Sequence, residues 1–395
     1  MEPTTAFAAL MSPDGRVDPY PLYRAIHGGG PVTAIGEGAY AVAGYAATDA
    51  ILRDQRARVV DASMMDGVWP DWRDNRAVAT IAASMLRANP PDHTRMRRLA
   101  AGAFTARRVA AMTDVVTAQA AALVDRMRDA DGPVDFMEAF AFPLPIGVIC
   151  ALLGVPASDH GWFRQRSADL TAVLEPQIDL DELAAAHRGA AEIEGYLRDL
   201  VAHRRRAPAD DLTSALIGPL DGDELIANLL LLLVAGFETT TNLLGNGLVT
   251  LLAHPGLVAA LPDQPEAYVE ELLRYDSPVQ LTSRVLLGDV ALPGGGTLPA
   301  GGWLMLLLGA ANRDPARFHE PDRFDPWRAD GGPISFGAGP HYCLGAPLAR
   351  LEARVAFPLL LRALPGLALA GPPERRDRLT LRGYASLPVA MHLGG

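Results

Sequence analysis

Apolar residues recur every three or four positions along most of the chain, the spacing that places them on one face of an α-helix. The pattern predicts long helices over residues 109–127, 183–206 and 224–252. Proline and glycine interrupt it at 131–133 and 254–256, where helices are expected to end. Helical segments therefore dominate the predicted structure.

A few short runs rich in β-branched and aromatic residues indicate strands toward the two ends of the chain. These runs cover residues 39–42, 285–292, 303–308 and 389–393. The triple glycine at 294–296 is typical of a hairpin turn between two strands. The pattern as a whole predicts a mainly α protein with small β-sheets.

The domain organisation is predicted to be simple. The chain has 395 residues, and no linker and no internal repeat divides it. We therefore expect a single domain over residues 1–395. The N-terminal ~20 residues are expected to be loosely ordered, as chain ends often are.

Composition narrows the classes of function. The formal net charge of −11 argues against a general nucleic-acid binder. The longest apolar run, Leu229 to Phe237, is shorter than the ~20 residues that cross a bilayer. Residues 1–5 lack the positive charge and apolar core of a signal peptide. We expect a soluble, cytoplasmic protein with no membrane and no nucleic acid among its partners.

The two cysteines differ in their surroundings. Cys150 lies in the apolar segment 146–153, which predicts a buried helix, and no disulfide framework is recognisable. Residues 336–345 read Phe-Gly-Ala-Gly-Pro-His-Tyr-Cys-Leu-Gly and lead into an apolar helix. The glycines of this loop let the main chain approach a flat group closely. Amide N–H groups at the helix start favour a thiolate at Cys343, and a thiolate is a soft ligand that suits iron.

This loop resembles the haem-binding loop of the cytochrome P-450 superfamily, the haem-thiolate monooxygenases. The resemblance implies a single-domain cytochrome P-450 fold, with the haem between the oxygen-activating helix and the cysteine-loop helix. It implies heme b (iron protoporphyrin IX) as cofactor, with Cys343 as the metal ligand and axial thiolate. Phe336, Gly337 and Gly345 would then contact the haem from the same loop.

The predicted helix 224–252 carries Ala235, Gly236, Glu238 and Thr239 in an apolar setting. A buried acid and a buried hydroxyl are costly unless they are satisfied or used. Threonine can bond to backbone carbonyls and bend a helix, and a structural bend alone would explain these residues as well. By the resemblance, this is the oxygen-activating helix: Ala235 and Gly236 adjoin the haem, Thr239 orients protons to bound O2 and Glu238 relays them inward.

The resemblance also assigns donors to the two haem propionates. His93 and Arg97 lie four residues apart, on one face of a predicted helix. Arg284 and His341 resemble two further propionate donors of the family. For any one of these residues alone an exposed charge is the favoured interpretation, and it is their occurrence together at the expected positions that supports propionate binding.

Glu271 and Arg274 resemble the family's Glu-x-x-Arg motif, whose role is structural. They are expected to lock onto residues 321–324, with Arg323 as the third member of the network. We assign them to folding and haem retention.

The implied reaction needs partners. No flavin or iron–sulfur domain is visible, so electrons are expected from a ferredoxin and a ferredoxin reductase. A basic cluster at residues 95–108 could attract an acidic donor, although solvated helix charge would explain it equally well. The co-substrates are O2 and a small-molecule substrate, in a setting of bacterial specialised metabolism.

Three segments could face the substrate, by the same resemblance. They are residues 62–87, residues 160–177, and residues 279–281 together with 384–387. Two rival functions stay open. One uses the same fold for oxidative coupling, cyclisation or desaturation without oxygen insertion. The other is a haem sensor or carrier without turnover, against which the pair Glu238–Thr239 speaks, because a carrier needs no proton relay.

Overall fold

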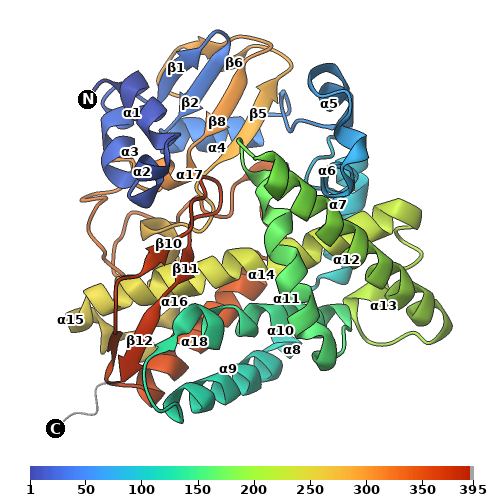
Figure 1. Ribbon diagram of the computed structural model, residues 1–395. Helices are drawn as coiled ribbons and strands as arrows, with labels where there is room; N and C mark the ends of the chain where they lie inside the picture. The colour runs from blue at the N-terminus through green and yellow to red at the C-terminus, as the bar shows by residue number, and fades with distance from the viewer. Residues whose placement is uncertain (392–395) are drawn as a thin grey trace. The chain divides into compact units, whose positions relative to one another are not determined.

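A computed structural model describes residues 1–391 of the chain. The described chain forms two compact units. The first unit contains residues 1–59, 242–346 and the chain from 365 onward, and the second contains 60–241 and 347–364. Helices predominate in the ribbon and strands form small sheets, so the predicted fold class is confirmed (Figure 1).

The first unit contains helices and every named strand except β4. Its helical segments are α1 (Pro3–Leu10), α2 (Pro13–Val17), α3 (Tyr20–His27), α4 (Tyr45–Arg53), α15 (Pro255–Val258), η5 (Leu261–Asp263), α16 (Pro265–Tyr275), α17 (Leu308–Ala311) and η6 (Gly339–His341). Its strands are β1 (Val32–Gly36), β2 (Ala39–Val42), β3 (Ala57–Arg58), β5 (Thr282–Leu286), β6 (Val290–Ala291), β7 (Thr297–Leu298), β8 (Trp303–Leu306), β9 (Leu367–Leu369), β10 (Glu374–Arg375), β11 (Tyr384–Ser386) and β12 (Pro388–Met391).

The second unit is built mostly of helices. They are α5 (Ala62–Val68), η1 (Trp72–Asp74), α6 (Arg76–Ala82), α7 (Asp92–Ala103), α8 (Ala106–Ala111), α9 (Thr113–Arg128), η2 (Met137–Ala141), α10 (Pro143–Leu153), η3 (Ala157–Asp159), α11 (His160–Leu170), η4 (Thr171–Leu174), α12 (Leu180–Arg206), α13 (Leu212–Leu216) and nearly all of α18 (Ala346–Ala363). The short strand β4 (Val134–Asp135) also lies here. Helix α14 (Gly222–Ala253) runs from the second unit into the first.

The largest sheet has the strand order β1-β2-β8-β5-β3. Strands β2 and β8 run parallel, in the register Ala39↔Trp303 to Val42↔Leu306, and the other neighbours are antiparallel. One face of the sheet packs against α4, and α1 and α3 lie beside β1 and β2 (Figure 1).

The strand predictions hold in part. Residues 39–42 form β2 as expected, whereas the run 285–292 divides into the end of β5 and β6. The glycines at 294–296, with φ between 86° and 108°, turn the β6–β7 hairpin as predicted. Strand β12 covers residues 388–391, so residues 392 and 393 of the last predicted strand lie outside the described residues.

The first twenty residues differ from expectation. They form helices α1 and α2 and enter α3, instead of being loosely ordered. Ala6 and Leu10 are fully buried and pack with Tyr23 and Ile26 in one core cluster. The apolar face of α1 therefore holds the terminus in place.

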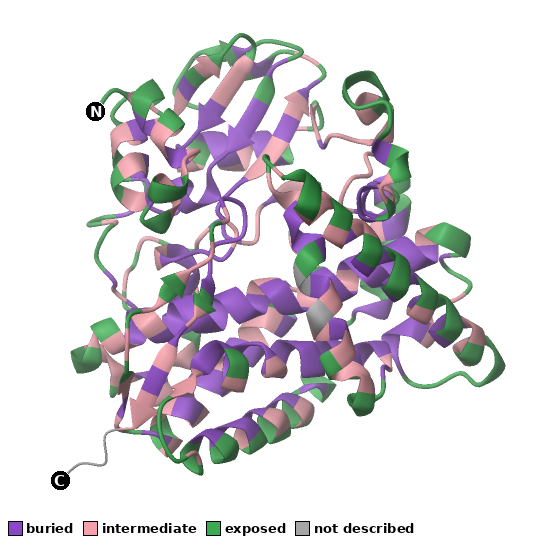
Figure 2. Ribbon diagram, viewed as in Figure 1, coloured by how far each residue is buried: buried purple, intermediate pink, exposed green. Residues whose placement is uncertain are grey.

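The long predicted helices are present, with shifted ends. The run 109–127 breaks at Met112 into α8 and α9. Helix α12 begins at Leu180 because the Asp179 side chain caps it, accepting a hydrogen bond from the backbone N–H of Glu182. Helix α14 is long and apolar enough to cross a membrane, yet 72% of its most apolar stretch is buried within the protein, as in the core helix of a globular protein (Figure 2).

A buried charge network closes the first unit around Asp276. This carboxylate accepts hydrogen bonds from the Tyr20 hydroxyl at 2.7 Å, from Arg382 Nε at 2.8 Å and from Arg375 Nη2 at 3.0 Å. Burial by itself would raise the pKa of Asp276, but Arg382 and Arg375 outweigh it and hold that pKa well below its usual range. The network ties α3 and the C-terminal strands to the end of α16.

Replacing Asp276 by asparagine should destabilise the protein by about 3–5 kcal/mol, because two arginines stay buried without their counter-charge. Urea unfolding would measure the change. Since the folded-state pKa is lowered, the contribution of Asp276 is present above pH ~4 and fades as the pH falls below that value. The difference between wild type and variant should therefore shrink at acid pH.

Asp377→Asn is the matched control. Its ion pair with Arg16 Nη1 spans 2.9 Å, but 58% of the Asp377 side chain is exposed. A loss of at most about 1 kcal/mol is expected from such an exposed pair. Equal losses for the two variants would contradict the special role of Asp276.

Candidate functional site

The loop before Cys343 adopts a backbone that only glycine accommodates easily. Gly337 and Gly339 have φ of 70° and 66°, in the left-handed region. A Cβ on Gly339 would collide with the backbone oxygen of Leu52, so α4 passes too close for any side chain there. The Cys343 N–H donates to the Phe336 oxygen at 3.0 Å and closes the loop. The Cys343 side chain is left half-buried.

The loop rests on the apolar core of the first unit. Ile334 and Ala338 are 2% and 4% exposed and share a core cluster with Leu52, Leu286 and Leu304. These partners come from α4, β5 and β8. The large sheet and α4 therefore pack against the loop, and this packing holds the segment that carries Cys343 in position.

Polar contacts fix the start of the same loop. Asn312, fully buried, accepts a hydrogen bond from the Ile334 N–H at 2.8 Å and donates Nδ2 to Ser335 Oγ at 2.7 Å. The Ser335 hydroxyl in turn donates to the Leu273 oxygen of α16 at 2.7 Å. The two residues before Phe336 are therefore bound to α16 and to the segment after α17.

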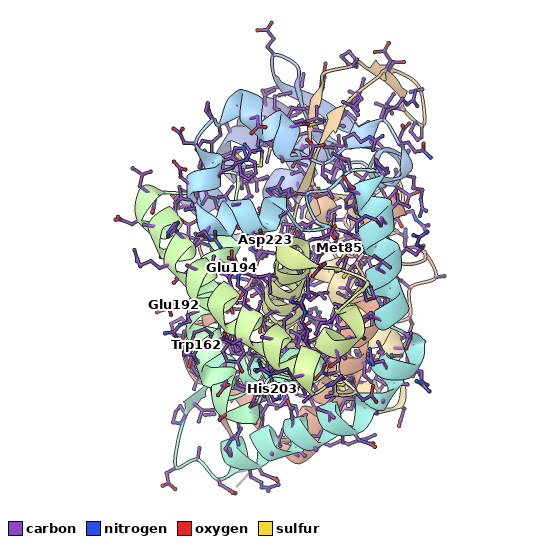
Figure 3. All side chains as sticks on the ribbon, turned by 90° about the vertical axis from the view of Figure 1, so that its right-hand side faces the viewer. Met85, Trp162, Glu192, Glu194, His203 and Asp223 are labelled. Carbon is purple, nitrogen blue, oxygen red and sulfur yellow. The ribbon has the colours of Figure 1, made fainter. Side chains whose placement is uncertain are left out.

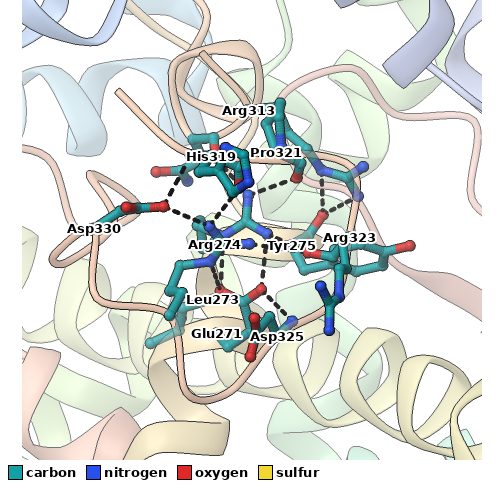
Figure 4. Close-up of polar contacts among 12 residues, drawn as sticks. Glu271, Leu273, Arg274, Tyr275, Arg313, His319, Pro321, Arg323, Asp325 and Asp330 are labelled. Carbon is teal, nitrogen blue, oxygen red and sulfur yellow. Dashed lines mark hydrogen bonds and ion pairs between the residues drawn. The ribbon is translucent and has the colours of Figure 1, made fainter. Parts of the chain in front are cut away.

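The pair Glu271–Arg274 lies beneath these contacts on α16. Arg274 donates Nε to Oε2 of Glu271 at 2.7 Å and Nη2 to Oε1 at 2.8 Å, a two-pronged pair whose side chains are almost fully buried (Figure 4). Arg274 Nη1 donates to the backbone oxygens of Asn312 and Pro321. One guanidinium thus holds the residue that orients the cysteine loop.

The expected role of Arg323 is wrong in one respect. Its backbone oxygen accepts from Arg274 Nη2 at 3.0 Å, but its side chain pairs with Glu320 at an exposed position. The third charged member is Arg328, which donates Nε to Glu271 Oε2 at 2.9 Å and is 9% exposed. Arg323 points away because the turn that offers its carbonyl to Arg274 directs its side chain outward.

No pattern in the sequence indicated Asn312, Ser335 or Arg328. None belongs to a spaced motif, and all three lie in irregular chain after α17. A polar residue in such a segment is usually solvated, so only the folded contacts distinguish them. The segment 321–324, in contrast, does meet Arg274 as predicted, through backbone oxygens.

In the second unit, helix α14 presents the predicted Glu238 and Thr239. Glu238 is 1% exposed, and Thr239 Oγ1 donates to the Ala235 oxygen at 2.9 Å. Thr240 Oγ1 donates likewise to the Gly236 oxygen at 3.3 Å. The threonines therefore bond to the backbone as the sequence predicted, and Glu238 is buried within the protein.

An open stripe interrupts the buried surface of this helix. Ala235 is exposed, and Leu232, Gly236 and Thr239 are half-buried, whereas their neighbours Leu233, Val234, Phe237 and Glu238 are buried. Positions 232, 235, 236 and 239 share one helix face. We call these four residues the open stripe. It offers small side chains and backbone to a flat partner.

Gly236 is required by packing on its other side. A Cβ there would lie 2.9 Å from the side chain of Ile149 on α10, so the glycine lets the two helices approach closely. The next residue, Cys150, is fully buried as predicted. Burial raises the pKa of the Cys150 thiol to about 12, and Asp159 adds to this shift, so the thiol stays neutral and inert.

The four expected propionate donors come from separate elements. His93, 2% exposed, and the half-buried Arg97 lie one turn apart on α7. Arg284, 4% exposed, stands on β5, where Nη1 donates to Ser283 O at 2.6 Å and to Thr282 Oγ1 at 3.1 Å. His341, half-buried, ends η6 two residues before Cys343.

These residues fit a haem. Cys343 supplies one ligand, and residues 1–391 contain no group of three or more His, Cys, Asp or Glu that could hold a metal ion by themselves. An iron bound by Cys343 would therefore take its other ligands from a macrocycle. The glycine loop of the first unit offers such a macrocycle a backbone surface free of bulky side chains.

Comparison with known proteins decides the family. The cytochrome P450 family model matches residues 265–366, the part that runs from α16 through the cysteine loop into α18. Cytochrome P450 monooxygenase PikC of Streptomyces venezuelae is 39% identical over 96% of this chain and 93% of PikC. The 6-deoxyerythronolide B hydroxylase of Saccharopolyspora erythraea is 39% identical over 98% of this chain and 99% of that enzyme.

The chain belongs to the cytochrome P450 family. This chain superposes on a solved structure of P450BioI, in complex with an acyl carrier protein ligated to hexadec-9Z-enoic acid, with a TM-score of 0.90 at 34% sequence identity. The match covers 96% of this chain and 100% of the P450BioI chain. This P450 is thus a monooxygenase, an oxidoreductase whose cofactor is haem with a cysteine thiolate as axial ligand, and the family, fold and cofactor predictions are confirmed.

Asn312→Ala should loosen the cysteine loop of this P450. The variant leaves the Ile334 N–H without a buried partner and removes the bond that Ser335 Oγ accepts, while the Ser335 hydroxyl still donates to the Leu273 oxygen. Losing these two bonds should cost roughly 2–4 kcal/mol. Part of the protein should then lose thiolate ligation, seen as a weaker red-shifted Soret band of the reduced carbon monoxide complex per mole of haem.

Asn75→Ala serves as control, because Asn75 lies in the other unit, where it caps α6 by accepting from the Val78 N–H and donates Nδ2 to the Leu183 oxygen at 2.9 Å. Losing these two bonds should cost about 2 kcal/mol and leave the band intact. An unchanged band in Asn312→Ala would show that the loop holds its shape without this residue.

Proposed function

We propose that this P450 uses O2 and electrons from an external ferredoxin and ferredoxin reductase to oxidise a small organic molecule in bacterial specialised metabolism. The observation that carries the proposal is the half-buried Cys343 on a glycine loop, together with the acid and hydroxyl Glu238–Thr239 beside the open stripe. PikC and 6-deoxyerythronolide B hydroxylase, which are similar along their whole length, support the setting. We further propose a cytoplasmic location. We also propose one P450 domain over residues 1–395, because the structural match spans the whole of P450BioI.

Cys343 is the proposed axial ligand, with Phe336, Gly337 and Gly345 shaping the loop that faces the haem. When bound, the thiolate-ligated haem supplies the O–O cleavage chemistry. His93, Arg97, Arg284 and His341 are the proposed donors to its propionates, because arginine's fork matches a planar carboxylate and histidine adds a further N–H.

Glu238 and Thr239 are the proposed proton carriers. The Thr239 hydroxyl lies on the open stripe, held by the Ala235 oxygen, so it can accept a proton and pass one on within hydrogen-bond reach. Glu238, next to it and buried, can exchange protons inward from the helix interior. Ala235 and Gly236 keep the surface beside the hydroxyl free of bulky side chains.

The basic cluster at residues 95–108 carries fewer uncompensated charges than its sequence suggests. Within residues 95–108, Arg95 pairs with Glu224 and Arg108 with Asp210, so their charges are compensated. Arg98 and Arg107 are exposed and form no ion pair that the described residues show. These two arginines on α7 and α8 are the proposed contacts for an acidic electron donor.

Oxygen insertion is proposed over coupling or desaturation, since PikC and 6-deoxyerythronolide B hydroxylase are named as a monooxygenase and a hydroxylase. Turnover under labelled dioxygen would decide between them. Label in the product supports insertion, and an unlabelled product supports coupling, cyclisation or desaturation.

Cys343→Ser should abolish the red-shifted Soret band of the reduced carbon monoxide complex, because serine oxygen is a harder ligand that donates less charge to iron. Cys150→Ser is the matched control, as its thiol is fully buried in α10. The Cys150→Ser variant should keep the red-shifted band but should be less stable than wild type. A band that survives in Cys343→Ser would refute thiolate ligation by this residue.

Thr239→Ala should uncouple electron use from product formation. The variant loses the hydroxyl that passes protons, so the consumed reducing equivalents should appear as peroxide instead of product. Peroxide released per NAD(P)H consumed is the measurement. Thr240→Ala is the control, since Thr240 makes the equivalent backbone bond but is 2% exposed and off the open stripe. Equal coupling in both variants would show that protons arrive by another route.

A further inference from the structure

One arginine of the second unit lacks the partner that its neighbours have. Arg73 pairs with Asp66, and Arg76 with Glu194. Arg87 lies between α6 and α7, at the end of segment 62–87, and its side chain forms no hydrogen bond or ion pair with any residue from 1 to 391. No acidic side chain among residues 1–391 therefore compensates the positive charge of Arg87.

The surroundings of Arg87 make this arrangement unfavourable by itself. The side chain is half-buried, and burial lowers the pKa of its guanidinium with no nearby acid to oppose the shift. Asp61, just before α5, is engaged by other residues: it accepts from Asn89 Nδ2 at 2.8 Å and from Ser63 Oγ at 2.7 Å. Arginine stays charged in proteins, so a desolvated guanidinium is stabilised only when an anion meets it.

The loop places Arg87 at one end of the open stripe. The Met85 N–H donates to Oδ1 of Asn228 at 3.1 Å, which binds the loop to α14. Met85 is labelled in Figure 3. Asn228 is held in turn by its own bond from Nδ2 to the Glu224 oxygen at 2.8 Å. Asn228 lies on the helix face of Leu232, Ala235 and Thr239, and about 6 Å before Leu232 at 1.5 Å per residue.

The backbone beside Arg87 is also fixed on its other side. The Ser84 hydroxyl donates to the Ile81 oxygen at 2.7 Å and accepts from the Leu86 N–H at 3.3 Å. The Arg87 N–H donates to the Ser84 oxygen at 3.2 Å. A positioned backbone carrying an uncompensated side chain is what a binding contact requires, because little ordering remains to be done on binding.

We infer that Arg87 binds the carboxylate of an organic acid substrate whose apolar body extends along the open stripe toward Thr239. This inference rests on the proposed function and adds the class of substrate to it. The guanidinium fork matches a carboxylate in two parallel hydrogen bonds, and it orients the acid so that its far end is presented for oxidation. Apolar side chains such as Leu232 suit the body of such a molecule.

Matched pairs of acids and their primary amides test the inference on the haem-loaded protein. The pairs are dodecanoic acid with dodecanamide, and 4-phenylbutanoic acid with its amide. Within each pair the apolar body is the same, and only the acid carries a negative charge. Affinity is read from the substrate-induced change of haem spin state. Wild type should bind at least one of the acids, more tightly than its amide. Arg87→Gln should weaken that acid by roughly tenfold to a hundredfold and leave the amide unchanged.

Three further measurements separate the possible failures. Arg87→Lys keeps the charge without the fork and should recover only part of the affinity. Arg188→Gln, an exposed arginine on α12, should change nothing. Each variant should retain haem content and the red-shifted carbon monoxide band. A band missing from wild type would refute the proposed function itself.

The inference is overturned if neither acid binds to wild type that shows the band, or if amides bind as tightly as acids. It is also overturned if Arg87→Gln binds acids unchanged, or if that variant loses haem, since Arg87 would then serve the cofactor's own carboxylates.

Discussion

The buried pair Glu271–Arg274 is the constraint on which the cysteine loop depends. A desolvated guanidinium is tolerated only when all its donors are engaged, and Arg274 engages them on Glu271 and on the carbonyls of residues 312, 321 and 323. Those carbonyls belong to irregular chain that would otherwise have no reason to adopt one conformation. Asn312, so placed, then orients the two residues before Phe336. The buried ion pair thereby helps to set the position of the Cys343 thiolate.

Helix α14 shows a different balance. It is apolar enough to be buried throughout, yet its open stripe is left accessible, and the acid and hydroxyl that the proposed chemistry needs lie on or beside that stripe. Gly236 serves this arrangement from the opposite side, because Ile149 presses on it and leaves no room for a side chain. A single helix can therefore pack tightly on one face and offer reactive groups on another.

Much of the candidate site could be predicted because its residues occur at fixed spacings. The glycine loop around Cys343, the Ala235–Thr239 run and the pair Glu271–Arg274 were recognised by their resemblance to family motifs, and each motif lies within a few residues of continuous sequence. Arg328, Asn312 and Ser335 could not be predicted, because their partners are distant in sequence and their own segments are irregular. The ordered N-terminus escaped prediction for the same reason: Leu10 gains its burial from Tyr23 and Ile26 of another helix.

The sequence by itself determined the family, the cofactor and the thiol that suits its iron, since each depends on residues close together along the chain. Only the tertiary structure decided which charges are compensated. Arg95 and Arg108 read like Arg98 in the sequence, but acids from distant segments neutralise the first two and leave the third exposed. Arg87 likewise became distinctive only in the folded structure. There Asp61 binds Asn89 and Ser63 and does not pair with Arg87. Electrostatic compensation acts through space, and sequence spacing does not record it.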